Sequence, residues 1–143
     1  DRSSAASDVY KRQLQRTALR DQALAGGSRA ELLLGAQAAL ATQGNLPVVA
    51  SRLQQWLAGQ PGDAQAWQTL SRVQAAMGQR LRSVRSEAES RAAQLDFAGA
   101  ADRFRAAQML PVADRNADAM ELAIVDVRRR EVEALQRESA RQE

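Results

Sequence analysis

The chain has 143 residues, of which 45% are hydrophobic, 26% are charged and only 3% are aromatic. It contains no His and no Cys, which excludes, within this sequence, Ser-His-Asp and Cys-His catalysis, disulfides and metal sites with His or Cys ligands. The net charge is +3, and basic and acidic residues alternate along the chain. This alternation is typical of solvated helix faces, so we do not expect nucleic acid as the partner.

Good helix formers (Ala, Leu, Gln, Arg and Glu) dominate the sequence, whereas β-branched and aromatic residues are scarce. We therefore predict an all-α fold. The longest uncharged run, residues 32–51, approaches the length of a membrane span but contains Gly44, Asn45 and Pro47. Two short helices joined by a turn fit this run better, so no transmembrane segment is expected.

Residues 1–27 are predicted to form an N-terminal tail and one helix. The small polar residues 1–7 are expected to fray. The apolar spacing over residues 8–25 predicts a loosely amphipathic helix. Gly26 and Gly27 end it, because glycine adopts the left-handed conformation that helix C-termini often need.

Residues 28–110 are predicted to form five helices joined by short turns. The spacing of Ser28 and Glu31 is that of a capping box, and Leu33, Ala36 and Leu40 should share the buried face of the first helix. Further starts are marked by a proline suited to a first turn and by N-cap aspartates, at Pro47, Asp63 and Asp96. The expected helices cover residues 29–42, Pro47 to before Pro61, 64–77, 81–94 and 97–109.

Residues 111–143 are predicted to form a C-terminal capping helix. Pro111 marks a break, and we expect Asp114 to start one long helix. Its expected buried positions are Met120, Ile124, Val127 and Leu135, and its expected exposed ion pairs are Asp126–Arg130 and Glu133–Arg137. Residues after 135 should project or fray, because the apolar pattern stops there.

A repeat of 34 residues runs through the middle of the chain. It relates Ala30 to Ala64, Leu33 to Trp67 and Gly44 to Gly78. A helix–turn–helix unit of this length is the tetratricopeptide signature. The glycines fall at the turn inside each unit, and Pro61 falls where the first unit closes. The sequence thus predicts an α-solenoid of antiparallel helix hairpins.

A third set of matches lies half a unit out of phase. Phe97, Ala100, Phe104 and Ala107 have the spacing of the second helix of a unit. The helix at 81–94 would then be the second helix of one unit and the first of the next, which stacked hairpins allow because each helix is buried against both neighbours. The alternative is a plain helical bundle in which the matches arise by chance.

Two segments resemble one protein family. Residues 64–108, AQAWQTLSRVQAAMGQRLRSVRSEAESRAAQLDFAGAADRFRAAQ, and residues 121–133, ELAIVDVRRREVE, are similar to the C-terminal repeat region of bacterial envelope zinc metallopeptidases of the β-barrel assembly-enhancing protease type. In that family the repeats precede a segment like (E)ASxIDARLRE, and residues 122–131 have this form. The resemblance covers roughly residues 28–133.

This resemblance implies that the chain is the non-catalytic part of a periplasmic protease. The family's zinc is held by an H-E-x-x-H helix and a further Glu, which this sequence lacks, so no catalytic or metal-binding residue is assigned here, and zinc would sit in a separate catalytic domain. The implied partners are a substrate protein or peptide, the protease domain and the outer-membrane assembly machinery. Two alternatives stay open: a stand-alone adaptor or co-chaperone, and a nucleic-acid-binding protein whose binding would be salt-sensitive.

A concave groove is the expected binding surface of such an array. Its polar lining should come from residues at the first-helix positions: Gln65, Gln68, Arg72, Arg82, Arg85 and Glu89. Arginine binds carboxylates in a bidentate manner, so these arginines are candidates for holding an extended peptide. Trp56 and Trp67 are predicted to be core residues. The run 128–130, three arginines beside acidic residues, is predicted to be a solvated face.

Overall fold

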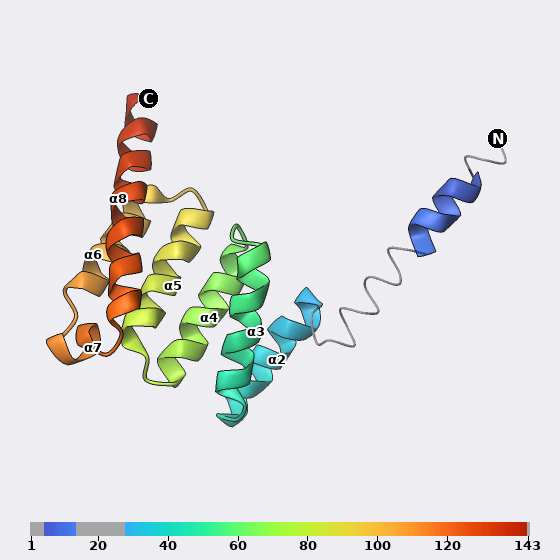
Figure 1. Cartoon of the computed structure of the whole chain (residues 1–143), viewed down its shortest axis with the longest axis horizontal. Coiled ribbons are helices and arrows are strands. Elements are labelled where there is room, and N and C mark those ends of the chain that lie inside the picture. The colour runs from blue at the N-terminus through green and yellow to red at the C-terminus, as the bar shows by residue number, and fades with distance from the viewer. Residues whose placement is uncertain (1–4, 14–27, 143) are drawn as a thin grey trace.

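The protein is all-α, as the composition predicts. The computed structural model describes residues 5–13 and 28–142, and within these ranges no residue forms a β-strand (Figure 1). Neighbouring helices run antiparallel and stack side by side, and a long helix closes the C-terminal end. Residues 28–142 form α2 (Arg29–Thr42), α3 (Leu46–Gly59), α4 (Ala64–Ala76), α5 (Arg80–Ala93), α6 (Phe97–Gln108), α7 (Val112–Asn116) and α8 (Ala119–Arg141).

The N-terminal region is described in part. Residues 5–13 form a helix whose side chains are exposed, including Val9 and Tyr10. The expected helix over residues 8–25 therefore begins earlier than predicted. Its remainder, with Gly26 and Gly27, lies outside the described residues.

The helix starts confirm the predicted caps. The Ser28 hydroxyl accepts a hydrogen bond from the Glu31 amide at 3.2 Å. The Asp63 carboxylate accepts from the Ala66 amide at 3.1 Å, and the Asp96 carboxylate accepts from the Gly99 amide at 2.9 Å. Each bond satisfies an amide that has no partner inside its helix.

The turns confirm one glycine and revise the role of the other. Gly78, between α4 and α5, has φ of +75°, a conformation that side-chain-bearing residues rarely adopt. Between α2 and α3, however, the left-handed residues are Gln43 and Asn45, with φ of 56° and 61°. Gly44 therefore breaks the helix without itself taking the left-handed conformation.

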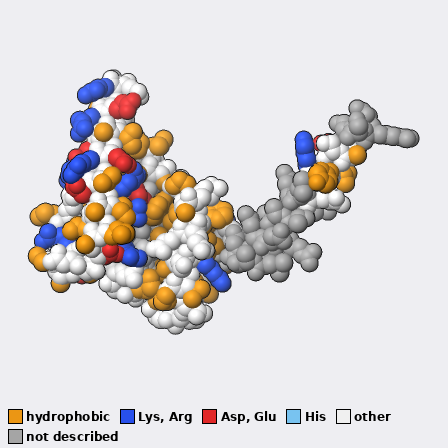
Figure 2. Space-filling model, viewed as in Figure 1, with side chains coloured by type: hydrophobic (Ala, Val, Ile, Leu, Met, Phe, Trp, Pro, Cys, Tyr) orange, Lys and Arg blue, Asp and Glu red, His pale blue; other side chains and the backbone are white. Residues whose placement is uncertain are grey.

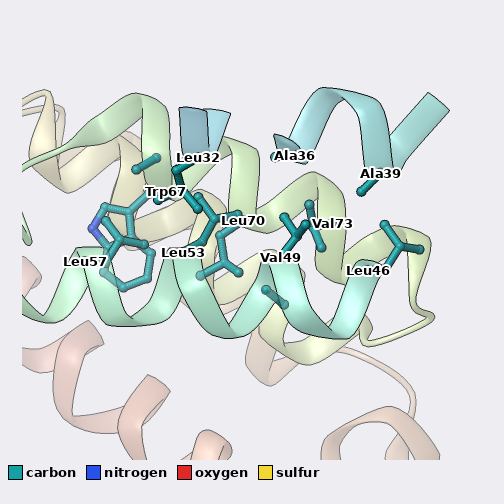
Figure 3. Close-up of a cluster of buried hydrophobic side chains, with 12 residues drawn as sticks. Leu32, Ala36, Ala39, Leu46, Val49, Leu53, Leu57, Trp67, Leu70 and Val73 are labelled. Atoms are coloured by element: carbon teal, nitrogen blue, oxygen red, sulfur yellow. The ribbon is translucent and has the colours of Figure 1, made fainter. Parts of the chain in front are cut away.

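A first hydrophobic core joins α2, α3 and α4 (Figure 3). In α2 the buried residues are Leu32, Ala36 and Ala39, whereas Leu33 and Leu40 are only partly buried. The prediction thus placed the buried face at Leu33 and Leu40, each one residue after the observed Leu32 and Ala39. The reason is that α3 and α4 together cover the face that holds Leu32. The other members are Leu46, Val49, Ala50, Leu53, Leu57, Ala66, Trp67, Leu70 and Val73.

A second hydrophobic core joins α5, α6 and α8. Its centre is formed by Phe104, Val125 and Val132, which are fully buried, and its remaining members are Leu81, Ala88, Ala100, Ala101 and Ala107. Between the two cores lies the interface of α4 with α5, which is lined by serines and a glutamine. The fold therefore consists of two hydrophobic blocks separated by a polar layer.

The C-terminal helix differs from its prediction in where it starts and in which face it buries. The segment after Pro111 first forms the short α7, and Asp118 then caps α8 by accepting from the Glu121 amide at 3.0 Å. The face that packs on α6 carries Val125 and Val132. Three predicted core residues are instead exposed: Met120 by 76%, Val127 by 52% and Leu135 by 40%.

The polar residues of α8 also pair in part differently from the prediction. The pair Asp126–Arg130 is present at 2.5 Å. Glu133, however, binds Arg129 at 3.0 Å and Arg105 of α6 at 3.2 Å, where Arg137 was the predicted partner. The helix continues to Arg141, well beyond the end of its apolar pattern.

Two long-range ion pairs bear on the arrangement half a unit out of phase. Arg29, at the start of α2, binds Asp63, the N-cap of α4, at 2.7 Å. Arg82, in the first turn of α5, binds Asp118, the N-cap of α8, at 2.6 Å. The residues of these pairs are 34 and 36 positions apart. Both pairs thus join the first turn of one helix to the N-cap of a later helix, α2 to α4 in one case and α5 to α8 in the other. In addition, α5 forms a hairpin with α4.

Candidate functional site

A hollow of about 650 Å³ lies between α3 and α8, and residues of α4 and α5 also line it. We call it the α3/α8 hollow. Its volume is in the range of small-ligand and side-chain pockets. Its apolar lining consists of Leu57, Ala58, Pro61, Trp67, Leu70, Ala92, Ala93, Phe97 and Leu135. Its polar lining consists of Gln54, Arg85, Glu89 and Arg128, together with the backbone at Gly62.

Charged side chains are concentrated in the block of α5 to α8 and are sparse in the block of α2 to α4. Figure 2 shows arginine and acidic side chains intermingled along α8, while the side of α2 to α4 seen in this view is largely uncharged or hydrophobic. The α3/α8 hollow is lined from both blocks. One wall is therefore mainly apolar, and the other adds a group of ion pairs.

Glu89 is the centre of that ion-pair group. Its side chain is 7% exposed and accepts hydrogen bonds from Arg85 of the same helix at 3.0 Å and from Arg128 of α8 at 2.8 Å. Arg85 also lies 3.5 Å from Glu121 and 5.1 Å from the ring centre of Trp67. A buried carboxylate needs such partners, since its charge would otherwise be strongly disfavoured.

Two residues that join α8 to α5, Arg128 and Asp118, have shifted pKa values. Burial disfavours the charged form of Arg128, but its hydrogen bonds to Glu89 and Glu131 outweigh this and raise the pKa of its guanidinium. The pKa of Asp118 is lowered, first by the Glu121 amide and then by Arg82. Both shifts favour the charged forms of Arg128 and Asp118, whose ion pairs with Glu89 and Arg82 join α8 to α5.

The structure brings together two of the six predicted groove residues. Arg85 and Glu89 line the α3/α8 hollow, and Arg82 lies one turn away, bound to Asp118. The other three, Gln65, Gln68 and Arg72, are exposed on α4, where Gln65 accepts a hydrogen bond from Arg29 at 2.9 Å.

Helix geometry explains this separation. The three exposed α4 residues follow one another at three- and four-residue steps, and they lie on the side of α4 opposite Trp67 and Leu70. It is Trp67 and Leu70 that border the α3/α8 hollow. The predicted groove positions of α4 and of α5 therefore face different sides of the array.

Sequence reasoning missed the walls that α3 and α8 provide. Ala58 and Gln54 of α3 carried no local signal of a site, and Leu135 was predicted to be part of the core. Arg128 pairs with Glu89 across 39 residues, a contact that no short-range spacing indicates. Only the placement of α8 beside α5 brings these side chains together.

Both tryptophans belong to the core, as predicted. Trp67 is 9% exposed, and its indole N–H donates to the Pro61 carbonyl at 2.9 Å. Trp56 is partly buried and donates to Asp63 at 2.9 Å. Asp63 also binds Arg29, and this bond is the main reason that the pKa of Asp63 is lowered to about 2. The bonds from Trp56 and from the Ala66 amide lower the pKa further, whereas burial opposes the shift.

The arginine run of α8 is solvated only in part. Arg130 is 69% exposed, in agreement with the predicted solvated face. Arg128 and Arg129 are 30% and 25% exposed, and they bind Glu89, Asp126 and Glu133. Much of the charge in this segment therefore joins α8 to α5 and to its own neighbouring turns.

Comparisons with known proteins add no relative. No family model, curated protein or solved structure matches the chain. Within residues 5–13 and 28–142, no helix combines the length and apolar character needed to cross a membrane. In the same ranges, acidic side chains do not gather in a group of three or more able to hold a metal ion.

Proposed function

We propose that this chain is a non-catalytic protein-interaction domain built from tetratricopeptide-like hairpins, and that it holds a peptide segment of a partner protein in the α3/α8 hollow. The observation that carries this proposal is the lining of the hollow. Side chains from α3, α4, α5 and α8 converge on it, and they combine apolar walls with fixed charges at one side. Such a combination is typical of binding sites.

The lining indicates the chemistry of the bound segment. Apolar side chains of a peptide would lie against Ala58, Pro61 and Leu135, the exposed apolar residues of the lining, where burial stabilises by roughly 25 cal/mol per Å² of apolar surface. Gln54 is an exposed polar residue of the lining, and its side-chain amide can donate a hydrogen bond to a carbonyl of a peptide backbone.

A peptide is favoured over nucleic acid by the pairing of the arginines. Arginines of the described residues that form ion pairs with carboxylates are Arg29, Arg80, Arg82, Arg85, Arg91, Arg105, Arg128, Arg129 and Arg130. A phosphate backbone would have to displace these carboxylates. We therefore expect no shift of DNA or RNA even at low salt, where electrostatic binding is strongest.

The test uses peptides selected from a random display library on the wild-type chain. Ala58 is exposed and borders the α3/α8 hollow, whereas Ala134 is exposed on α8 and does not border it. Ala58→Glu should weaken the selected peptides at least tenfold, because it places a charged side chain against an apolar wall. Ala134→Glu is the matched control and should leave affinity unchanged.

Two outcomes would count against peptide binding in the hollow. One is a selection that yields no peptide with measurable affinity by fluorescence anisotropy. The other is equal affinity for the wild type and Ala58→Glu. Circular dichroism of both variants shows whether a lost affinity reflects the site or the fold.

We further propose that the domain belongs to a periplasmic zinc-dependent peptidase, in which it positions substrates or outer-membrane assembly partners beside the protease domain. The support is the resemblance of residues 64–108 and 121–133, which form α4 to α6 and the first half of α8 and contribute most of the hollow. An H-E-x-x-H stretch encoded upstream in the same gene is the expected finding. Zinc retained stoichiometrically by this chain after dialysis would speak against it.

The second candidate is a stand-alone adaptor or co-chaperone with the same hollow. Residues of α3, α4, α5 and α8 line the α3/α8 hollow, and an adaptor would use this lining to hold its partner's peptide. The coding sequence separates the two candidates. Under the adaptor proposal, no protease motif is encoded in the same reading frame.

A further inference from the structure

The side of α8 that points away from the array carries a row of exposed apolar residues. Helix geometry places this side opposite the buried Val125 and Val132. Met120 is 76% exposed and Val127 is 52% exposed, and the exposed Ala134 continues the row at the same seven-residue step. We call these three residues the outer row. Exposed apolar residues gathered on one helix face indicate a contact surface.

Two charged rows of opposite sign flank the outer row. Arg130 and Arg137 follow its last two members by three residues and form the basic row, while Glu131 and Glu138 follow them by four and form the acidic row. Steps of three and four residues fall on opposite sides of a helical row. Arg130 and Glu131 each have an ion-pair partner on α8, yet their side chains are still 69% and 53% exposed.

The C-terminal turns of α8 extend past the rest of the array. Figure 1 shows this helix continuing beyond the ends of α5 and α6, and residues 137–142 are exposed. Among the described residues, neither Arg137 nor Glu138 forms an ion pair. A helix end without tertiary contacts is marginal in water, so a second helix lying alongside would stabilise it.

We propose that the outer side of α8 pairs with α8 of a second copy of this chain, parallel and in register. In a parallel pair related by a twofold axis, the row on one side of the contact meets the row on the other side of the second helix. The basic row of each copy then faces the acidic row of the other, with the two outer rows between them. This self-complementarity of charge is the reason that the favoured occupant is a second copy.

The antiparallel arrangement lacks this match. It brings each charged row against its own kind, unless the pair is centred on Val127. In that register Arg130 of one copy lies beside Ala123 of the other and gains no acidic partner. Charges at the edge of an interface set orientation more than affinity, so they favour the parallel pair without making it tight.

The length of α8 limits the strength of the pairing. The helix has 23 residues and is therefore about 34 Å long. One helix face of that length is at the low end of specific interfaces, which bury about 800 Å² per partner, so we expect a micromolar dissociation constant. The pairing is separate from the proposed function, because no residue of the three rows lines the α3/α8 hollow.

Sedimentation velocity measures the pairing without any ligand. At about 0.5 mM, the average mass should approach twice that of one chain. Val127→Glu brings two carboxylates face to face in the pair and should weaken the dimer at least tenfold. Val48→Glu is the matched control, because Val48 is 50% exposed on α3, and it should leave the dimer unchanged. Circular dichroism checks that both variants fold.

A cysteine in the outer row tests the orientation, because the sequence has no Cys. Ala134→Cys meets its own counterpart in the parallel, in-register pair, so oxidised glutathione should link most of this variant into dimers. Gln55→Cys, exposed on α3, is the control and should remain largely unlinked. Arg137→Glu should weaken the dimer severalfold, and adding Glu138→Arg should restore it, because the two charges then exchange rows.

A chain that remains monomeric at about 0.5 mM would overturn the proposal, whichever other partner binds α8. A dimer that Val127→Glu leaves intact would show that the copies meet through another surface. A dimer in which Ala134→Cys does not link would overturn the parallel register. None of these results depends on whether the α3/α8 hollow binds a peptide.

Discussion

Asp63 joins the first helix hairpin to the next helix, and its removal should cost stability in a pH-dependent way. The carboxylate accepts hydrogen bonds from Arg29, from the Trp56 indole and from the Ala66 amide. These contacts lower the pKa of Asp63 from its ordinary value of 3.8 to about 2. Asp63→Asn keeps the shape of the side chain and an acceptor oxygen but removes the charge.

The size of the effect follows from the shift. A change of nearly two pH units corresponds to at most about 2.5 kcal/mol, at about 1.4 kcal/mol per unit. Asp63 is 12% exposed, but its partner Arg29 is 44% exposed, so solvent screens part of this interaction. We therefore expect Asp63→Asn to lower the free energy of unfolding by roughly 1–2 kcal/mol at pH 7.

The pH dependence has a definite sign. Because the pKa of Asp63 is lower in the folded than in the unfolded chain, the unfolded state binds more protons between pH 4 and pH 2. The stabilisation is complete above the unfolded pKa and is lost as the pH falls toward 2. Wild type and Asp63→Asn should then converge in stability.

Urea unfolding followed by circular dichroism at several pH values provides the measurement. Asp102→Asn is the matched control, since Asp102 is 70% exposed and binds only a neighbour on its own helix among the described residues, Arg105 at 3.0 Å. The control should change stability by less than about 0.5 kcal/mol. An equal loss for Asp63→Asn at pH 7 and near pH 2 would refute the charge argument.

Three further variants test the packing, the ion pairs and the turns. Phe104→Ala should lower the free energy of unfolding, measured by chemical denaturation, by about 3–5 kcal/mol, because the ring is fully buried. Met109→Ala, at a position 84% exposed, is the control and should lower it by less than about 0.5 kcal/mol. Glu89→Gln should cost about 2–3 kcal/mol, since the two arginines that flank the buried carboxylate lose their shared partner; a neutral outcome in the same assay would show that these ion pairs do not hold α8. Gly78→Ala should lower the melting temperature through a strain of about 1–2 kcal/mol, because its φ is +75°. Gly44→Ala should be nearly neutral, and equal costs for the two glycines would contradict the assigned turn conformations.

Short-range features were predictable from the sequence. The caps at Ser28, Asp63 and Asp96 depend on residues three positions apart, and the structure confirms them. Glycine and proline likewise located the turns. The boundaries of the first five array helices followed to within one or two residues, because each depends on its own neighbourhood in the chain.

Buried faces were harder to predict where apolar residues cover a wide arc. In α8, Met120 and Val127 have the spacing of a core stripe, yet α6 covers the adjacent face that carries Val125 and Val132. Both faces contain apolar residues, so periodicity alone does not choose between them. The choice is made by the long-range pairing of Arg82 with Asp118 and of Glu89 with Arg128, which fixes the rotation of α8 beside α5.

The candidate site was predictable only in part for the same reason. Arg85 and Glu89 were identified because both fall at first-helix positions of the predicted repeat. The opposite wall comes from α3 and α8, which are distant in sequence. The assignment of Gln65, Gln68 and Arg72 to the same groove assumed one unbroken repeat phase, whereas these residues lie on the side of α4 opposite the hollow.

The most direct test of peptide binding in the α3/α8 hollow is a backbone amide NMR titration with a library-selected peptide. Binding there should shift the resonances of the residues that border the hollow from α3, α5 and α8, which are Gln54, Leu57, Ala58, Glu89, Ala92, Ala93, Arg128 and Leu135. Shifts confined to the exposed side of α4, around Gln65, Gln68 and Arg72, would contradict the proposal and place the peptide on the opposite side of the array.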